Sequence, residues 1–225
     1  MQSDKLYRIQ KSDFPKLERL LTECFEDDPL YTKLITDKDE RMRLMPELFK
    51  CDLTEYYNSC EMYSDSPELN SILVVSDEAE PYNHLQYLLD ETIAGISSES
   101  YIIKEDPTLK TLKNVLLAKN YLNSKWTEDL HDDNRLHVIY LAVRPSMQHH
   151  GLVDRLMSET IKYSEEHNMM ISLETHNEKN VDMYRHFGFR VFEVVEEHFD
   201  LKQYCLIRQA LSDKAEIVEK AVNES

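Results

Sequence analysis

A loop built around Gly151 is the first place where this sequence could do chemistry. Residues 148–153 read Gln-His-His-Gly-Leu-Val and lie between an apolar run, Leu136 to Val143, and a helical pattern that begins near Leu152. A loop leading from a strand into a helix aims several backbone N–H groups and the positive end of the helix dipole at one point, which suits a phosphate. Glycine lets an anion approach that backbone closely. The loop predicts a phosphate site, and a plain tight turn is the alternative for one isolated glycine.

A second group of polar and aromatic residues lies about twenty residues further on. Residues 173–189 read Leu-Glu-Thr-His-Asn-Glu-Lys-Asn-Val-Asp-Met-Tyr-Arg-His-Phe-Gly-Phe, and residues 141–145, before the loop, read Leu-Ala-Val-Arg-Pro. Together with the loop, these segments resemble the GNAT superfamily of acetyl-CoA-dependent N-acetyltransferases. The resemblance covers residues 135–208 firmly and the earlier chain more weakly.

The resemblance rests on three family motifs. They are a strand ending in a Val-x-Pro-like turn, a Gln/Arg-x-x-Gly-x-Gly/Ala loop opening a helix, and an Asn followed seven residues later by Tyr and then by Gly-Phe. The matching positions here are Gln148, Gly151, Val153, Asn177, Tyr184, Gly188 and Phe189. Val153 departs from the usual Gly or Ala. Because backbone N–H groups hold the phosphate, a valine side chain need not block it, but close packing of helix on strand becomes harder.

Membership of this superfamily implies a fold and a reaction. The fold would be a single α/β domain over residues 1–225, with a mixed, mostly antiparallel sheet of about seven strands flanked by helices. The reaction would be transfer of an acetyl group from acetyl-CoA to a primary amine of a small molecule or peptide by direct attack, without a metal. Phe-Glu-Asp-Asp-Pro-Leu at 25–30, with Leu173-Glu174-Thr175 and Asn180-Val181, looks most like the branch that contains puromycin-type acetyltransferases.

An acceptor amine needs help to lose a proton. An amine resembling lysine has a pKa of about 10.4, so near pH 7 only about one molecule in a thousand carries a free lone pair. His137 is one candidate base, because arylalkylamine acetyltransferases of the superfamily have a histidine six residues before the valine that ends this strand, as His137 precedes Val143. Glu174 is a second candidate base or an anchor for the ammonium group. An ordinary core histidine and a surface acid are the alternatives.

Tyr184 is the candidate general acid. In GNAT enzymes the tyrosine of this motif commonly lies near the coenzyme sulfur and gives its proton to the departing thiolate. A tyrosine with a pKa of about 10 stays protonated at neutral pH and can supply that proton. The alternative is a packed helix residue, one of thirteen tyrosines in the chain.

The resemblance also implies the coenzyme contacts. Backbone groups of Ala142 and Val143 would pair with the pantetheine amides, because the sheet of this fold splays apart after that strand. Asn177 would hydrogen-bond the pantetheine or adenosine part, and Asn180 could instead cap the following helix. The remaining contacts are the loop residues Gln148, His149, His150, Gly151, Leu152 and Val153, of which the two histidines add donors or are merely solvated.

Hydrophobic spacing predicts the elements that position these residues. Residues 135–143 form the strongest strand, apolar at nearly every position and therefore central and covered on both faces. A helix over 153–167, a strand over 171–174 and a short helix over 179–186 follow, an order that implies a right-handed crossover between parallel strands. The other expected elements are a strand at 6–10, a helix from a cap at Ser12 or Asp13 to Phe25, a break at Pro29, a helical segment at 40–57 with Pro46 in its first turn or at a kink, paired strands at 61–63 and 71–75, a terminal hairpin of 191–196 and 201–207, and a closing helix at 211–221.

Residues 81–130 are predicted to form a helical but irregular insert, longer than the minimum GNAT core needs. Its segment 109–122 is amphipathic. The insert is expected to form either a lid or wall over the acceptor site or a plain packing element.

The charge of the chain restricts its partners. A net charge of −17 argues against DNA or RNA, whose affinity for proteins rests on Lys and Arg. Residues 51–103 hold eleven acidic and no Lys or Arg residues, whereas residues 135–163 hold four basic and two acidic ones, so the loop is expected in a locally positive region. The acidic stretch is either a solvated surface or a means of attracting a cationic amine.

The sequence favours a cytoplasmic protein that is not bound to a membrane, because it has no long apolar run and Met1 to Lys5 do not begin a signal peptide. Cys24, Cys51, Cys60 and Cys205 lack the paired spacing of a zinc site or a disulfide framework.

Two other functions stay open at this stage. The same fold could bind acyl-CoA without turnover as a sensor, or the helical insert and acidic surface could form a protein-interaction module. The identity of the acceptor and the oligomeric state do not follow from the sequence.

Overall fold

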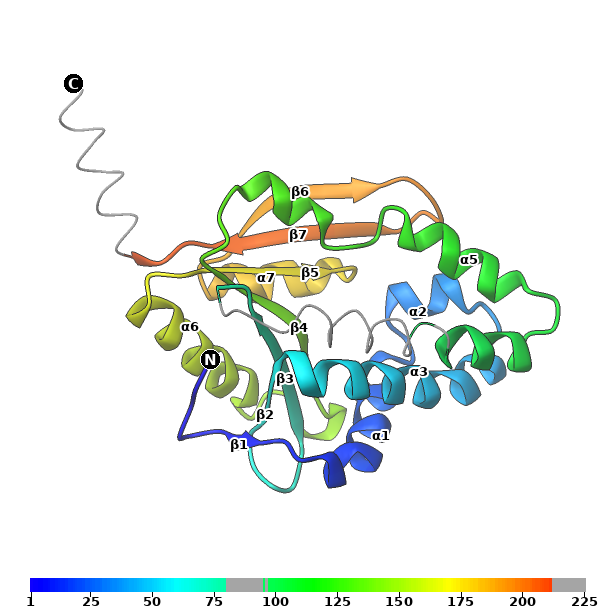
Figure 1. Ribbon diagram of the computed structural model, residues 1–225, viewed down its shortest axis with the longest axis horizontal. Coiled ribbons are helices and arrows are strands. Elements are labelled where there is room, and N and C mark those ends of the chain that lie inside the picture. The colour runs from blue at the N-terminus through cyan, green and yellow to red at the C-terminus, as the bar shows by residue number, and fades with distance from the viewer. Residues whose placement is uncertain (80–94, 96, 212–225) are drawn as a thin grey trace.

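The computed structural model describes residues 1–79, 95 and 97–211, and the predictions for 81–94 and for the closing helix at 211–221 fall almost entirely outside them. Seven strands form one sheet in the order β1-β2-β3-β4-β5-β7-β6 (Figure 1). β4 and β5 are parallel and every other neighbouring pair is antiparallel, which confirms the predicted mixed sheet. The strands are β1 Tyr7–Arg8, β2 Glu61–Ser64, β3 Ser71–Asp77, β4 Arg135–Val143, β5 Met170–Thr175, β6 Arg190–Glu196 and β7 Lys202–Arg208.

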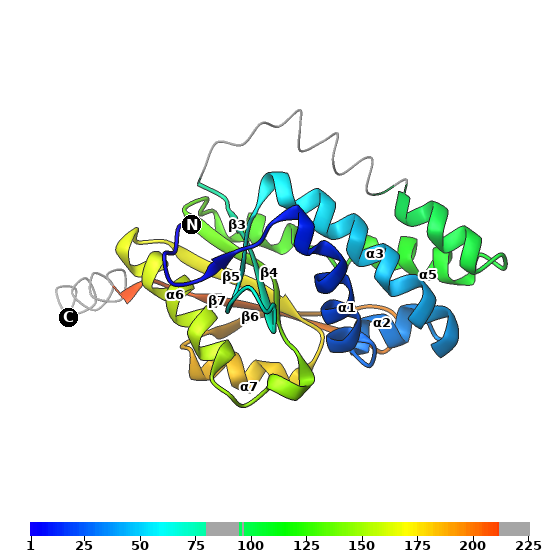
Figure 2. The ribbon, with the colours of Figure 1, turned by 90° about the horizontal axis from the view of Figure 1, so that it is seen from below.

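Helices cover both faces of the sheet (Figure 2). Because successive strand residues point to opposite faces, β3 contributes to two cores. Leu73 and Val75 pack with the core beneath α6 and α7, whereas Ile72 and Val74 pack with the core beneath α1 and α3. The helices are α1 Phe14–Phe25, α2 Pro29–Leu34, α3 Lys38–Ser59, α5 Lys110–Lys119, α6 Leu152–Glu166 and α7 Glu178–His186.

Pro29 and Pro46 lie at different places in their helices. Pro29 does not simply break the chain but begins α2, a helix that the sequence analysis missed. The Asp28 carboxylate caps α2 by accepting a hydrogen bond from the Leu30 N–H at 2.9 Å. Pro46 lies inside α3, because α3 already begins at Lys38, after the cap Asp37; of the two predicted positions, the first turn is wrong and the kink is the alternative that remains.

The described part of the predicted insert lies against the sheet and against α2. Residues 97–105 are helical, α5 follows, and a 3₁₀ turn spans Lys125–Leu130. Trp126 in that turn packs on Met170 of β5 and on Cys205 and Ile207 of β7. The insert thereby covers the face of β5 and β7 that α1 and α3 leave open. Within the described ranges no helix is long and apolar enough to cross a membrane.

Candidate active site

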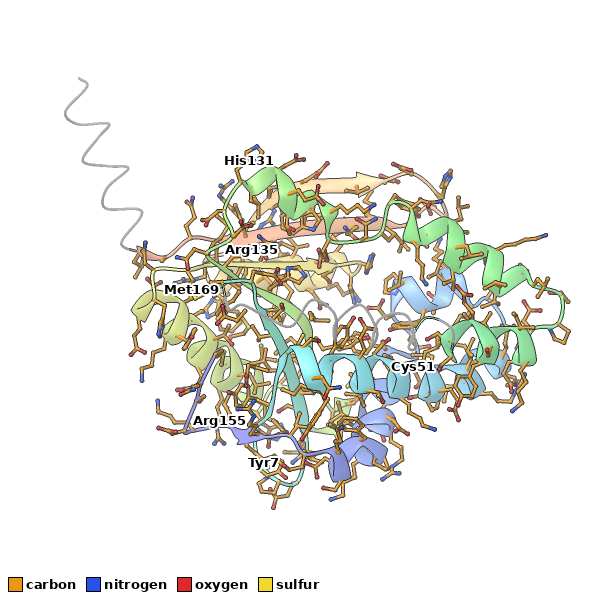
Figure 3. The ribbon with its side chains drawn as sticks, viewed as in Figure 1. Tyr7, Cys51, His131, Arg135, Arg155 and Met169 are labelled. Carbon is orange, nitrogen blue, oxygen red and sulfur yellow. The ribbon has the colours of Figure 1, made fainter. Side chains whose placement is uncertain are left out.

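The parallel strands β4 and β5 separate partway along their length. Their pairing runs from Arg135 opposite Met170 to Val138 opposite Leu173, and β4 then continues to Val143 without β5 beside it. A bulge in the pairing of β3 with β4 lies at the same point of β4. Val75 lies opposite Val138 and Val74 opposite Tyr140, which leaves Ile139 as the extra residue. Arg135 marks the end of β4 that remains paired (Figure 3). The sheet therefore opens where the sequence places its candidate site residues.

A cleft of about 770 Å³ lies beside this opening and is called the α6 cleft below. It is bounded by the end of α1, the end of β4, the loop into α6 and the inner side of α7. Its lining residues are Cys24, Phe25, Asp27, Asp28, Leu141, Ala142, Val143, Met147, Gln148, His149, Gly151, Leu152, Val153, Asp154, Asn177, Asn180, Met183, Tyr184, His186 and Phe187. Of the predicted coenzyme contacts, all but His150 line this cleft.

The loop into α6 has the backbone geometry that an anion site needs. Gly151 occupies the cap position of α6 with φ +76°, a left-handed conformation that glycine adopts without strain. A Cβ placed on Gly151 would meet no heavy atom within 4 Å, so the glycine is required by its backbone angle and the space in front of it is open. The first N–H groups of a helix have no partner within it, so those of α6 are available to a ligand.

Val153 fits this arrangement without blocking it. Its side chain is partly buried and packs against the core beneath α6, which also contains Leu156 and Met157. The departure from the family's small residue is therefore accommodated by packing.

The expectation of a locally positive loop was wrong. The charged residues that line the α6 cleft, as far as the chain is described, are Asp27, Asp28 and Asp154, and two histidines accompany them. Arg144 instead pairs with Glu23, and Arg155 donates to the Lys5 carbonyl oxygen at 2.8 Å, beside the N-terminal segment (Figure 3). Any phosphate bound here would rely on backbone N–H groups and the α6 dipole rather than on basic side chains.

The end of β4 presents backbone groups to the opening. The Arg144 N–H donates to the Asn70 carbonyl oxygen on the β3 side at 2.8 Å. Since backbone groups alternate along a strand, those of Leu141 and Val143 point away from β3, whereas those of Ala142 point toward it. The Val143 carbonyl accepts from Cys24 Sγ at 3.3 Å and from Gln148 Nε2 at 3.4 Å. Of the predicted pair, only Val143 points its backbone groups away from β3, whereas both residues line the cleft.

The two asparagines make different contacts at the start of α7. Asn177, not Asn180, caps α7, because its side chain accepts a hydrogen bond from the Lys179 N–H at 3.2 Å. Asn180 Nδ2 donates to Thr175 Oγ1 at 3.3 Å. Asn180 therefore connects α7 to the end of β5.

A smaller cavity of about 240 Å³, called the throat below, continues from the α6 cleft into the opening between β4 and β5. The two cavities share Phe25, Asp28, Leu141, Asn180 and Tyr184 as lining residues, so they adjoin. The residues that line the throat but not the α6 cleft are Leu30, Tyr31, Leu122, Asn123, Ser124, Val138, Ile139, Tyr140, Glu174, Thr175, His176 and Gln203. Leu122, Asn123 and Ser124 belong to the predicted insert and form part of the throat wall.

Tyr184 lies at the junction of the two cavities. It is 6% exposed, its ring packs edge-on against Phe189 at 5.6 Å, and no hydrogen bond reaches its hydroxyl from any described residue. Burial raises the pKa of Tyr184 well above its usual value. The phenol therefore stays protonated at neutral pH, with its proton uncommitted.

The two predicted bases form one pair. His137 Nε2 lies 3.0 Å from Glu174 Oε2, and His137 Nδ1 lies 2.8 Å from Ser172 Oγ. Trp126 Nε1 donates to the other carboxylate oxygen of Glu174. Burial acts to raise the pKa of Glu174, but the His137, Trp126 and Ser124 contacts act in the opposite direction and together lower it. Glu174 is therefore a fixed anion in the wall of the throat.

Sequence analysis missed two residues of this site. Trp126 is the single tryptophan of the chain but is far from Glu174 in sequence, so no local pattern connects them. His176 could have been found, because alternation along β5 places Ser172, Glu174 and His176 on the same side of the chain.

The arrangement places a protonated phenol and a carboxylate in the wall of one small cavity. Tyr184 enters from α7, where the cleft opens, and Glu174 enters from β5, with Phe25, Tyr31 and Tyr140 as aromatic walls. Within the described ranges no group of three or more His, Cys, Asp or Glu side chains could hold a metal ion. Such a site can hold a cation and supply a proton.

Comparison with known proteins supports the observed fold. The model of the acetyltransferase (GNAT) family matches residues 42–189. A search of curated proteins gave no match. Among solved structures, a protein of Corynebacterium glutamicum described as histone acetyltransferase HPA2 and related acetyltransferase is 16% identical, with a TM-score of 0.60 over 93% of this chain and 97% of that one.

Two further solved structures share the fold. An N-acetyltransferase from Staphylococcus aureus has a TM-score of 0.55 and 14% identity, with 90% of this chain and 98% of that one covered. The ribosomal-protein-S18-alanine N-acetyltransferase from Escherichia coli has a TM-score of 0.51 and 9% identity, with 91% and 92% covered. The family model covers more than half of the chain, and this chain therefore belongs to the GNAT acetyltransferase family.

Proposed function

We propose that this protein transfers the acetyl group of acetyl-CoA to the primary amine of a small cationic acceptor, by direct attack in the throat. The observation that carries the proposal is the continuity of the α6 cleft with the throat, with Tyr184 lining both and Glu174 lining the throat. A thioester held in the cleft would have its carbonyl near the opening between β4 and β5, where an amine in the throat could reach it.

The α6 cleft has the groups that coenzyme A needs. Its phosphates fit the unpaired N–H groups at the start of α6, in front of Gly151. Its pantetheine amides fit the backbone groups of Leu141 and Val143. There the pantetheine would lie beside β4 in the place that β5 leaves empty. Asn177 and the side chains of the 148–153 loop lie where they could hydrogen-bond the remainder.

Glu174, the acceptor's amine and Tyr184 act in turn in the transfer. Glu174, fixed by His137 and Trp126, attracts the acceptor's ammonium group into the throat. After the ammonium group loses one proton, the free amine forms a C–N bond with the thioester carbonyl carbon, and the tetrahedral intermediate collapses with loss of the C–S bond and of a second proton from the nitrogen. Tyr184 then protonates the departing thiolate, a task that its raised pKa suits because the proton is present throughout the neutral range.

The throat also restricts the acceptor. Asp28 and Glu174 are its carboxylates, and no Lys or Arg lines it among the described residues, so an acceptor with a positive charge is favoured. Phe25, Tyr31 and Tyr140 favour an apolar body next to the amine. The segments that resemble the puromycin-type branch meet here, since Phe25, Asp28 and Leu30 share the throat with Glu174 and Thr175. We place the protein in that branch as part of this proposal.

Thiol release from acetyl-CoA across a panel of amines tests the proposal. The panel contains an alkyl monoamine, a diamine, an amino acid, an aminonucleoside and a peptide with a free N-terminus, each paired with an analogue whose amine is replaced by a hydroxyl. We expect release with at least one cationic amine and none with its hydroxyl analogue. Binding of coenzyme A without release for any amine would contradict the proposal.

A further inference from the structure

His176 directly follows β5 and lines the throat with Glu174 and Tyr184. Its contacts differ from those of His137. No hydrogen-bond partner is found for His176 Nε2 within the described chain, although this atom is buried. A buried nitrogen without a partner is uncommon in proteins and points to a missing ligand.

His137 is poorly placed to accept a proton from a substrate. Its Nδ1 is occupied by Ser172 Oγ at 2.8 Å, and its Nε2 by Glu174 at 3.0 Å and Ser124 Oγ at 3.3 Å. Both ring nitrogens are therefore committed within the protein. Glu174 is a weak base because its pKa is lowered, and its two oxygens already accept from His137 and Trp126.

His176 lies in a different electrostatic setting. Burial lowers its pKa and outweighs the Glu174 carboxylate and the Gln203 side chain, which both act to raise it. The imidazole is therefore neutral at neutral pH, and a neutral imidazole has one nitrogen lone pair that can accept a proton.

We propose that His176 is the catalytic base, taking a proton from the acceptor amine while Glu174 holds the positive charge. This inference rests on the proposed function. The ammonium gives one proton to the His176 ring, and the neutral amine then forms the C–N bond. As the C–S bond breaks, the thiolate takes the Tyr184 proton. The nitrogen then loses its second proton, which reaches the Tyr184 phenolate through water and reprotonates it. His176 returns its proton to solvent, so one proton is released per turnover.

The pH profile and the acceptor's own basicity test this role. The titratable groups that share the throat with His176 are Asp28 from the α1–α2 turn, Tyr31 from α2, Tyr140 from β4, Glu174 from β5 and Tyr184 from α7. Of these, the tyrosines have raised pKa values and Glu174 a lowered one, while burial raises the pKa of Asp28. The Asp28 contribution is separated by recording the same profile for Asp28→Asn.

His176→Gln removes the titrating group and keeps a polar side chain. With an amine acceptor identified in the panel, we expect kcat/KM at neutral pH to fall about a hundredfold to a thousandfold, as is typical for loss of a general base. The kcat/KM of the variant should keep rising with pH, because the fraction of free amine rises. The ratio of parent to variant kcat/KM should be smaller for acceptors whose amine has a low pKa. His167→Gln, an exposed histidine at the end of α6, is the matched control and should behave as the parent.

The outcomes separate the two proposals. A wild-type chain that acetylates the amine and a His176→Gln variant with unchanged kcat/KM and pH profile would overturn the role of His176 alone. A deficit that stays constant across acceptor pKa would also overturn it, because a structural defect has no such dependence. A wild-type chain that acetylates no amine would overturn the proposed function and this inference with it. The thermal shift with coenzyme A shows whether the variant is folded, and His176→Asn replaces it if it is not.

Discussion

At the scale of single residues, the pKa values of Tyr184 and Glu174 shift in opposite directions, although burial acts to raise both. Nothing in the described chain hydrogen-bonds the Tyr184 hydroxyl, so burial alone raises its pKa. Burial also acts on Glu174, but the His137 and Trp126 contacts more than offset it, so its pKa falls. At neutral pH the throat is therefore lined by both a protonated phenol and a carboxylate. This is the distribution that transfer to a cationic amine requires.

Tyr184→Phe deletes one hydroxyl and leaves the ring packing against Phe189 nearly intact. Loss of a general acid should lower kcat by about a hundredfold to ten-thousandfold. Because the pKa of Tyr184 is raised, the parent should show no loss of rate from this group below pH about 10, its ordinary pKa.

The control is Tyr57→Phe on α3, whose ring packs edge-on against Phe14 at 5.5 Å and which lines neither the α6 cleft nor the throat. Steady-state kcat values of both variants, with coenzyme binding measured separately, test whether the Tyr184 hydroxyl is the general acid. A kcat for Tyr184→Phe within about threefold of the parent would make Tyr184 a packing residue rather than the acid.

At the scale of elements, local patterns predicted most strands and helices and several strand pairings, but not the register between paired strands. β4 was predicted with its observed bounds because nine consecutive residues, Arg135–Val143, are mostly apolar and turn residues flank them. The pairing of His137 with Glu174 depends on the register between β4 and β5, in which His137 lies opposite Ser172. That register is set by packing across the crossover, which no short segment encodes. α2 was missed because proline at a first helical position and proline in a break look alike in sequence.

The loop into α6 is tested by changing Gly151. Acetyl-CoA at about 100 times its dissociation constant should add roughly 2.7 kcal/mol to the stability of the parent. For a chain of this size that corresponds to a rise in melting temperature on the order of 5 to 10 °C. Gly151→Val should remove most of this rise, because φ +76° is strained for a β-branched residue and its side chain would enter the open space in front of the loop.

Val153→Ala is the matched substitution in the same loop. It should lower the melting temperature of the free protein, because Val153 packs against the core, and should preserve the rise with acetyl-CoA. An unchanged rise in Gly151→Val would show that the coenzyme phosphates bind elsewhere.

The link between α3 and β4 makes stability depend on pH. Tyr140 donates a hydrogen bond to the Asp52 carboxylate at 2.6 Å, yet burial raises the pKa of Asp52 to about 6. In an unfolded chain this pKa is about 3.9, so ionisation of Asp52 opposes folding. The penalty is absent below pH about 4, grows as the pH rises to about 6, and is complete above it.

Asp52→Asn should therefore stabilise the protein by about 1–3 kcal/mol at pH about 8, with the gain disappearing near pH 4. Denaturant unfolding at the two pH values measures this. Asp182→Asn, at an exposed site on α7, should show no such pH-dependent gain. Equal effects of Asp52→Asn at both pH values would mean that Asp52 does not ionise with a raised pKa.

At the scale of the whole molecule, charge acts oppositely on the two substrates. The chain has a net charge of −17, and aspartates line the α6 cleft. An anionic coenzyme therefore approaches against the field of the protein, whereas a cationic amine approaches with it. Backbone groups and the α6 dipole must hold the coenzyme after it has arrived.

Raising the ionic strength should therefore raise the KM for a cationic amine and lower the KM for acetyl-CoA. Exposed charges are screened beyond about 10 Å at 0.1 M salt and beyond about 30 Å at 0.01 M, so these two concentrations bracket the effect. Steady-state kinetics at both concentrations, with a neutral salt, give both constants. Shifts of both constants in the same direction would show that the net charge does not steer the substrates.

The most direct test of acetyl transfer identifies both products of one reaction. Wild-type protein is incubated with acetyl-CoA and the amine that gives the fastest thiol release, and the acceptor is analysed by mass spectrometry while free thiol is counted. The site described here predicts one N-acetyl amide for each thiol released. Thiol released without acetylated amine would show that water, rather than an amine in the throat, attacks the thioester, and would contradict the account.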